Sequence, residues 1–261
     1  MSMLRENDDM VAKLEAAIFF EDTDVLIINK PSGVLVHNTG SDHDSYTVAD
    51  WLAERELAVY DVGESQRDPR TGALLRRGGV VHRLDKETSG VLVLVKNQAA
   101  YDHCKRQFHD RLTEKEYRAI VYGTLSRPFG TIDRPIGRSA KDWRRRSAEP
   151  GAKGTLRDAV THWEAVGHGS YHGETFSYVK LIPKTGRTHQ LRVHLKAIDR
   201  PIVCDELYAG TRVDTSNNLN LQRLALHAHS LTLQLPSGES RRFVAPLPLD
   251  LTKAVDHIAE G

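Results

Sequence analysis

Asp85 stands among basic and apolar residues in the segment VVHRLDKETSG, residues 80–90. Asp85 follows the pair His82-Arg83, precedes Lys86 and comes shortly before the apolar run VLVLV. A carboxylate that a rigid scaffold holds at the edge of a buried strand can act as a nucleophile or a general base. The alternative is a surface ion pair with a neighbouring cation, which would contribute under about 1 kcal/mol to stability. Charge pattern alone favours the ion pair, whereas the position before an apolar strand favours chemistry.

A second candidate is the segment PKTGRTHQLRVHL, residues 183–195. Gly186 permits a tight turn, Thr188 is a candidate N-cap, and Arg192 lies one turn into the helix that would follow. An amphipathic helix with a solvated basic face would turn Arg192 outward. A catalytic role would instead place this guanidinium against Asp85.

One further stretch could contact a nucleic acid, and a second carries a tyrosine with no local sign of a special role. Trp143 lies among Lys141 and Arg144, Arg145 and Arg146, so a base could stack on the indole while the cations bind phosphates. A solvated loop with one exposed tryptophan fits the same residues. Tyr117, in EKEYRAIVYG, has the position of a strand residue, where a tyrosine most often belongs to the core.

The composition is that of a globular protein without extracellular or membrane features. The 261 residues are 39% hydrophobic and 27% charged, with a formal net charge of +1, which is too balanced to argue for nucleic-acid binding. Cys104 and Cys204 are far apart, and His189 and His194 are five residues apart, so no disulfide framework or metal site is indicated. No apolar run approaches the roughly 18 residues that span a bilayer, and the N-terminus lacks a signal peptide. We expect a soluble, cytoplasmic protein.

Periodicity predicts a mixture of strands and helices. Helical spacing occurs over 47–60, 98–111 and 188–198. Strand patterns occur over 17–30, 91–97, 114–125, 159–167, 175–186, 223–236 and 241–246. We find no fixed-period repeat and no long low-complexity linker, so a strand-rich α+β domain is predicted.

Four stretches, in this order along the chain, together resemble one known family. NKPSGVLVH, HRLDKETSGVLVLVKN, KEYRAIVYG and KTGRTHQLRVHL closely resemble the motifs of the RluA-type pseudouridine synthases, which isomerise uridine in ribosomal and transfer RNA. With RLALHAHSLTL and a basic segment before AVTHWE, the resemblance covers the chain from about Ala17 to about Pro246.

The resemblance implies a catalytic fold around a long mixed, mostly antiparallel sheet, with flanking helices and a central cleft. It makes Asp85 the catalytic aspartate, Tyr117 the tyrosine that stacks on the base, and Arg192 the arginine that pairs with the aspartate. Arg83 would enter the helix or take the place of the extruded base. The reaction is a redox-neutral isomerisation, so no cofactor and no metal are expected.

The resemblance also implies that RNA is the partner, bound by a monomer. The expected RNA contacts are Lys30, His82, Arg83, Lys86, Arg144, Arg145, Arg146, Lys184, Arg187 and His189. Many relatives carry an S4 RNA-binding module, but only some sixteen residues precede the first predicted strand. We therefore expect an N-terminal extension at 1–16 and a catalytic domain at 17–261 without an S4 domain.

The predicted function is the conversion of uridine to pseudouridine in ribosomal or transfer RNA. The sequence leaves open whether Asp85 attacks C1′, attacks C6 or removes a proton from the sugar. One alternative is a non-catalytic RNA-binding protein, although an acid in a basic groove would repel phosphate. Another is a glycosidase or a uracil-removing hydrolase, which usually needs two carboxylates, whereas only Asp85 is presented by a motif. The family pattern also has Gly-Asp where this chain has Cys204-Asp205, which makes the loop geometry there a question for the structure.

Overall fold

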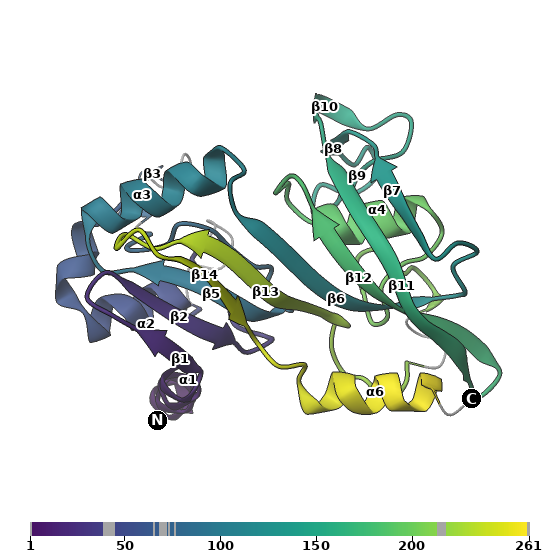
Figure 1. The fold of residues 1–261 in the computed structure, drawn as a ribbon, viewed down its shortest axis with the longest axis horizontal. Coiled ribbons are helices and arrows are strands. Elements are labelled where there is room, and N and C mark those ends of the chain that lie inside the picture. The colour runs from purple at the N-terminus through teal and green to yellow at the C-terminus, as the bar shows by residue number, and fades with distance from the viewer. Residues whose placement is uncertain are drawn as a thin grey trace. The chain divides into compact units, whose positions relative to one another are not determined.

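The computed structural model describes residues 2–38, 45–64, 66–67, 72, 74–75, 77–212 and 218–259 of the chain. They form two compact units. The first unit combines residues 1–114 with 230–245, and the second combines residues 115–229 with 246–261. In both units antiparallel strands combine with helices, which confirms the α+β class and the mostly antiparallel pairing (Figure 1). The expected central cleft stays a prediction.

The first unit contains an antiparallel sheet with a fully buried strand. The strands β1, β2 and β5 are neighbours in that order, and β13 pairs with β14. Every residue of β5 is buried, as the run VLVLV predicted. The strands are β1 (Ile18–Glu21), β2 (Val25–Lys30), β5 (Ser89–Val95), β13 (Leu226–Gln234), which starts in the second unit, and β14 (Ser240–Val244). A short pair, β3 (Gln66–Arg67) and β4 (Leu74–Leu75), completes the strands described in this unit.

The helices described in the first unit are α1 (Ser2–Ala16), α2 (Val48–Arg55) and α3 (Gln98–His109), with a 3-10 turn η1 (Leu57–Asp61). Two of them begin at capping residues that the sequence supplies. Thr47 and Asp50 form a reciprocal capping box at α2, and Asn97 caps α3. The single helix predicted over 47–60 was wrong in its length. Glu56 adopts φ −130° and ψ 86°, outside the helical region, so α2 ends there and the chain continues as η1.

The residues expected to form an N-terminal extension form α1 and pack on α2. Leu14 is fully buried. Trp51 Nε1 donates a hydrogen bond of 3.0 Å to Glu15 Oε1, and Arg55 forms an ion pair with the same carboxylate. In the described ranges, no helix combines the length and the apolarity that crossing a bilayer would require.

The second unit contains a run of four neighbouring antiparallel strands and a small three-stranded sheet. The four strands have the order β6, β12, β11, β7, and the small sheet has the order β10, β8, β9. The strands are β6 (Glu114–Tyr122), β7 (Phe129–Asp133), β8 (Ile136–Arg138), β9 (Arg146–Ser147), β10 (Lys153–Arg157), β11 (Val160–Tyr171) and β12 (Glu174–Pro183). Two long helices, α4 (Gln190–Ala197) and α6 (Leu249–Ala259), belong to this unit.

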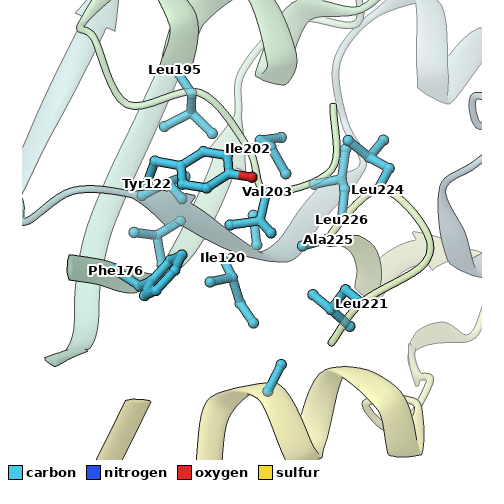
Figure 2. Packing of buried hydrophobic residues seen from close by; sticks show 14 of the residues in the cluster. Ile120, Tyr122, Phe176, Leu195, Ile202, Val203, Leu221, Leu224, Ala225 and Leu226 are labelled. Atoms are coloured by element: carbon cyan, nitrogen blue, oxygen red, sulfur yellow. The ribbon is translucent and has the colours of Figure 1, made fainter. Parts of the chain in front are cut away.

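The core of the second unit gathers side chains from strands, loops and both helices. Figure 2 shows Ile120 and Tyr122 of β6, Phe176 of β12 and Leu195 of α4 around Val203. Each of these side chains is at most 1% exposed. Burying an aliphatic or aromatic side chain of this size stabilises a fold by about 1.5–3 kcal/mol. The core therefore fixes α4 against the sheet.

Helix α6 lies against β11 at a point where the strand carries no side chain. A Cβ added at Gly169 would lie 1.9 Å from the carbonyl oxygen of Ile258 on α6. Nearby, the rings of Tyr171 and His257 stack with centroids 4.5 Å apart and planes 4° apart. The sequence therefore needs glycine at position 169 for the helix to approach the strand this closely.

We predict that Gly169→Ala lowers the free energy of unfolding by about 1–3 kcal/mol, because the backbone of α6 must move to admit a methyl group. Gly167→Ala is the matched control on the same strand, since a Cβ there meets nothing within 4 Å. It should change stability by no more than about 0.5 kcal/mol. Urea titration of both variants measures the difference, and equal stabilities would contradict the close approach of α6.

Candidate active site

Asp85 lies in the turn that leads into the buried strand β5. Its carbonyl oxygen accepts a hydrogen bond of 3.1 Å from Thr88 N, and its side chain is half-buried. Before the turn, Val95 N donates to Gly79 O, and Gly79 has a φ of 68°. A Cβ at Gly79 would lie 2.3 Å from Val95 O. Gly79 thus lets the chain pass close to β5, and the turn that follows presents Asp85 at the strand's edge.

A buried lysine ties the turn of Asp85 to the early motif NKPSG. Lys30 has no exposed surface, and its Nζ donates to the carbonyls of Pro31 at 2.8 Å, Val34 at 2.8 Å and Lys86 at 3.0 Å. Gly33 N also donates to Lys86 O, at 2.9 Å. The carbonyl after Asp85 is therefore held by a charged donor. This placement argues against the expected contact between Lys30 and RNA, because the ammonium lies inside the protein.

The other basic residues around Asp85 divide into one structural side chain and two exposed ones. His82 Nε2 accepts a hydrogen bond of 2.9 Å from Val93 N, and its ring stacks on Phe108 of α3 at a centroid distance of 4.4 Å. The imidazole thus links the turn to both β5 and α3. Arg83 and Lys86 are exposed, which is the placement that contact with RNA requires.

Arg192 is buried in α4 and paired with a carboxylate that the sequence did not single out for this role. Its Nε and Nη2 donate to Asp205 Oδ2 and Oδ1 at 2.8 and 2.7 Å. Arg192 is 8% exposed and Asp205 1% exposed. Backbone N–H groups of Leu207 and Tyr208 also donate to Asp205 Oδ1, both at 3.1 Å. The helix does not turn Arg192 outward, so a solvated basic face is excluded for this residue.

Tyr208 connects this ion pair to the start of α4. The guanidinium of Arg192 lies over the Tyr208 ring, 5.1 Å from its centroid. The Tyr208 hydroxyl accepts from Arg146 N at 2.9 Å and is hydrogen-bonded to His189 Nδ1 at 2.9 Å. The N-cap of α4 is His189 with φ 55°, not Thr188 as predicted. His189 has this left-handed backbone, and its ring is hydrogen-bonded to Tyr208. A side-chain cap from Thr188 would not need a left-handed backbone.

Cys204 occupies the position at which the resembling motif has glycine. Its φ is 59°, in the left-handed region, so the loop keeps the conformation that glycine favours although a side chain is present. The thiol donates to Leu221 O at 3.4 Å, and burial raises its pKa to about 11. It stays protonated near neutral pH and is not an activated nucleophile. The loop thus still delivers Asp205 to Arg192.

Tyr117 lies on β6, opposite Leu181 of β12, and is half-buried at the edge of the core. Tyr117 and Arg192 belong to the second unit, whereas Asp85 belongs to the first. The pairing of Asp85 with Arg192 therefore stays a prediction. Among the described residues, no group of three or more His, Cys, Asp or Glu side chains could hold a metal ion.

The basic residues expected to bind RNA in the second unit fall into two groups. Arg144 and Arg145 both form ion pairs with Asp142, with shortest distances of 2.9 and 3.3 Å. Arg146 and Arg187 line a cavity of about 490 Å³ instead. Lys184 is exposed beside this region, and His189 is committed to Tyr208.

Comparison with known proteins gives a family match over most of this framework. The family model described as RNA pseudouridylate synthase matches residues 24–197. The chain is 36% identical to an uncharacterized RNA pseudouridine synthase of Synechocystis over 254 residues, which covers 97% of the chain and 72% of that protein. It is 34% identical to the ribosomal large subunit pseudouridine synthase D of Vibrio cholerae over 245 residues, covering 90% of the chain and 68% of that protein.

A solved structure supports the same relation. The human RNA pseudouridylate synthase domain containing 1 is 29% identical and superposes with a TM-score of 0.69, covering 89% of this chain and 83% of the human one. Human RNA pseudouridylate synthase domain containing 4, at 24% identity and a TM-score of 0.70, has the same fold. It covers 98% of both chains.

We predict that Lys30→Met lowers the free energy of unfolding by at least about 2 kcal/mol, because three backbone carbonyls lose the charged donor that the buried Lys30 supplies. Lys86→Met, in the turn of Asp85, removes an exposed ammonium and should change stability by no more than about 0.5 kcal/mol. Thermal and urea unfolding of the two variants gives the comparison. If the Lys30→Met protein is as stable as the Lys86→Met protein, the three carbonyl contacts of Lys30 do not stabilise the fold as described.

We predict that Asp205→Asn lowers the free energy of unfolding by about 3–5 kcal/mol, because it leaves the buried Arg192 guanidinium without an opposite charge. Asp142→Asn is the control, since it removes a half-buried carboxylate from a surface ion pair with the exposed Arg144 and should lower the free energy of unfolding only slightly. If the two variants unfold at the same urea concentration, Asp205 does not hold Arg192 in the way described.

Proposed function

Because the chain belongs to the RNA pseudouridylate synthase family, we propose that it isomerises uridine to pseudouridine in ribosomal RNA, with Asp85 as the catalytic carboxylate. The chain is an RNA pseudouridine synthase, and RNA is its partner. The observation that carries Asp85 is its place in a turn that Lys30 fixes against the edge of β5. Relatives named for the large ribosomal subunit, at 34–36% identity, favour ribosomal over transfer RNA.

The reaction must start by taking the target base out of its stack. Extruding a nucleotide costs a few kcal/mol, and phosphate contacts from exposed cations offset that cost. We propose that Arg83, which is exposed two residues before Asp85, fills the space that the base leaves. Lys86 is exposed on the other side of the aspartate and supplies a cation for a neighbouring phosphate.

Isomerisation breaks the glycosidic bond from N1 to C1′ and forms a bond from C5 to C1′, so the C5 proton must leave. An ionised carboxylate can assist by adding to C1′ or C6, or by taking a proton from the sugar. All three routes require that Asp85 is charged and points at the nucleoside. The hydrogen bonds around Lys86 O restrict the turn, so the side chain needs little further ordering.

Arg192 is the proposed partner that keeps Asp85 charged and oriented. A guanidinium has five N–H donors, and Asp205 takes Nε and one donor of Nη2. We propose that Arg192 serves two carboxylates, Asp205, which fixes it, and Asp85, which it orients. A lysine would not do both, because a point charge lacks the planar fork.

Tyr117 is the proposed platform for the uracil ring. The ring of a half-buried tyrosine at the edge of a core is fixed by packing, and its face can stack on a base. Its hydroxyl is a candidate for moving the C5 proton. We further propose that the protein acts as a monomer in the cytoplasm, where ribosomal RNA is found.

We predict that Asp85→Asn lowers pseudouridine formation at least about a thousandfold while the protein still folds and binds RNA. The substrate is large-subunit ribosomal RNA of the host, transcribed without modification, and carbodiimide-dependent stops of reverse transcriptase mark the product. Asp110→Asn, which changes an exposed carboxylate of the same unit, should act like the wild type. The mass of the RNA must stay constant, since isomerisation releases no base.

Turnover by Asp85→Asn near the wild-type rate would show that Asp85 is not the catalytic carboxylate. Product on transfer RNA transcripts and none on ribosomal RNA would overturn the proposed substrate but leave the catalytic residue in place.

A further inference from the structure

The small sheet of the second unit carries a cavity lined by four arginines. Arg138 of β8, Arg146 of β9, Arg157 of β10 and Arg187, in the turn before α4, line a space of about 490 Å³. Among the residues that the structure describes, the lining includes no carboxylate. We refer to this space as the arginine pocket. Its volume is in the range of sites for nucleotide-sized ligands, about 300–1,000 Å³, and exceeds what one inorganic phosphate fills.

The strand register concentrates positive charge beside the pocket. Arg138 lies opposite Arg146 on one side and opposite Lys153 on the other, so three cations form one row across β9, β8 and β10 (Figure 1). Residues directly opposite each other share a face of the sheet, and like charges there destabilise the pairing. In the described ranges no carboxylate lies within ion-pair distance of these cations. Bound anions would relieve this repulsion.

The pocket is built from side chains and backbone that other contacts fix. The N–H of Arg146 donates to the Tyr208 hydroxyl at 2.9 Å. Arg187 donates from Nε to Asp158 O at 3.0 Å and from its backbone N to Gln190 Oε1 at 3.0 Å. In contrast, Arg144 and its neighbour on the same loop are held by Asp142. The chain thus neutralises the arginines at the tip of the loop and leaves a positive pocket at its base.

The exposed aromatic residue in this region favours RNA over a small anion. Trp143 lies in the loop between β8 and β9, and it is 81% exposed. Arginine guanidinium groups bind phosphate through paired N–H donors, and a neighbouring indole can stack on a base of the same strand. A free phosphate has no aromatic ring that could stack on the indole. We infer that the arginine pocket binds consecutive backbone phosphates of the RNA substrate.

This inference rests on the proposed function, because it assigns a further binding site for the same RNA. It adds Arg138 and Arg157 to the expected contacts and removes Arg144 and Arg145 from them. The pocket positions the substrate and takes no part in the bond changes. Its loss should therefore raise KM and leave kcat unchanged.

The test compares Arg138→Gln/Arg157→Gln with Arg127→Gln/Lys253→Gln. Both double variants remove two exposed cations from the second unit, but only the first removes them from the pocket. The probe is a fluorescein-labelled RNA hairpin of 24 nucleotides with a uridine-rich loop, and anisotropy gives Kd between 50 and 300 mM salt. The pocket variant should bind about tenfold or more weakly, and the slope of log Kd against log salt should fall by about one to two. Its Tm should equal or exceed that of the wild type, because repulsion across β8 is relieved.

Several outcomes would overturn the inference that the arginine pocket binds RNA. Unchanged Kd and salt slope would do so, and so would an equal loss in the control variant, which would show a net-charge effect. A rise in Tm with 5 mM pyrophosphate that the pocket variant loses, with RNA binding intact, would assign the site to a small polyphosphate instead. Failure of the proposed function looks different. In that case the wild type makes no pseudouridine in ribosomal RNA, while the pocket variant still shows weaker binding to the hairpin.

Discussion

The buried ion pair between Arg192 and Asp205 is the interaction on which the second unit's candidate site depends. A guanidinium that is 8% exposed is tolerated only because a carboxylate that is 1% exposed meets it with two parallel hydrogen bonds. Asp205 then orders the following turn by accepting from the backbone of Tyr208. The Tyr208 ring packs under the guanidinium, and its hydroxyl holds both His189 and the backbone of Arg146. One charge pair thus positions both the helix that carries Arg192 and the edge of the arginine pocket.

Lys30 solves the same problem in the first unit with different partners. Its ammonium is buried and meets three carbonyl oxygens in place of a carboxylate. Carbonyl dipoles satisfy the ammonium without adding a further negative charge to the turn that carries Asp85. In both units a long basic side chain thus lies inside the protein: Lys30 fixes the turn that carries Asp85, whereas Arg192 is the candidate catalytic group and is itself fixed by Asp205.

Local pattern predicted part of the secondary structure, but it missed the helices α1 and α6 and the strands β7, β8 and β10. It also gave no long-range partners. The run VLVLV gives a fully buried strand, and the helices at 98–109 and 190–197 follow their apolar spacing. The motif order identifies Asp85, Tyr117 and Arg192 as candidates because those signals are contiguous in sequence. The partner of Arg192 is thirteen residues away, and Lys86 O, a partner of Lys30, is fifty-six away. Contacts between residues so far apart in the sequence are set by the tertiary fold, and composition and periodicity do not predict them.

Two places in the chain show that the role of a residue depends on its structural surroundings as well as on its type. Cys204 holds a left-handed φ of 59° that glycine would adopt without strain, so the loop has a backbone that glycine favours although a thiol side chain is present. The run Arg144-Arg145-Arg146 looks like one basic patch, yet Asp142 engages the first two, and the third is turned to the pocket with Arg138 and Arg157. Where the fold leaves cations opposite one another without a carboxylate, their repulsion destabilises the folded state. Only a bound anion can offset this repulsion, so such a place is suited to bind anions.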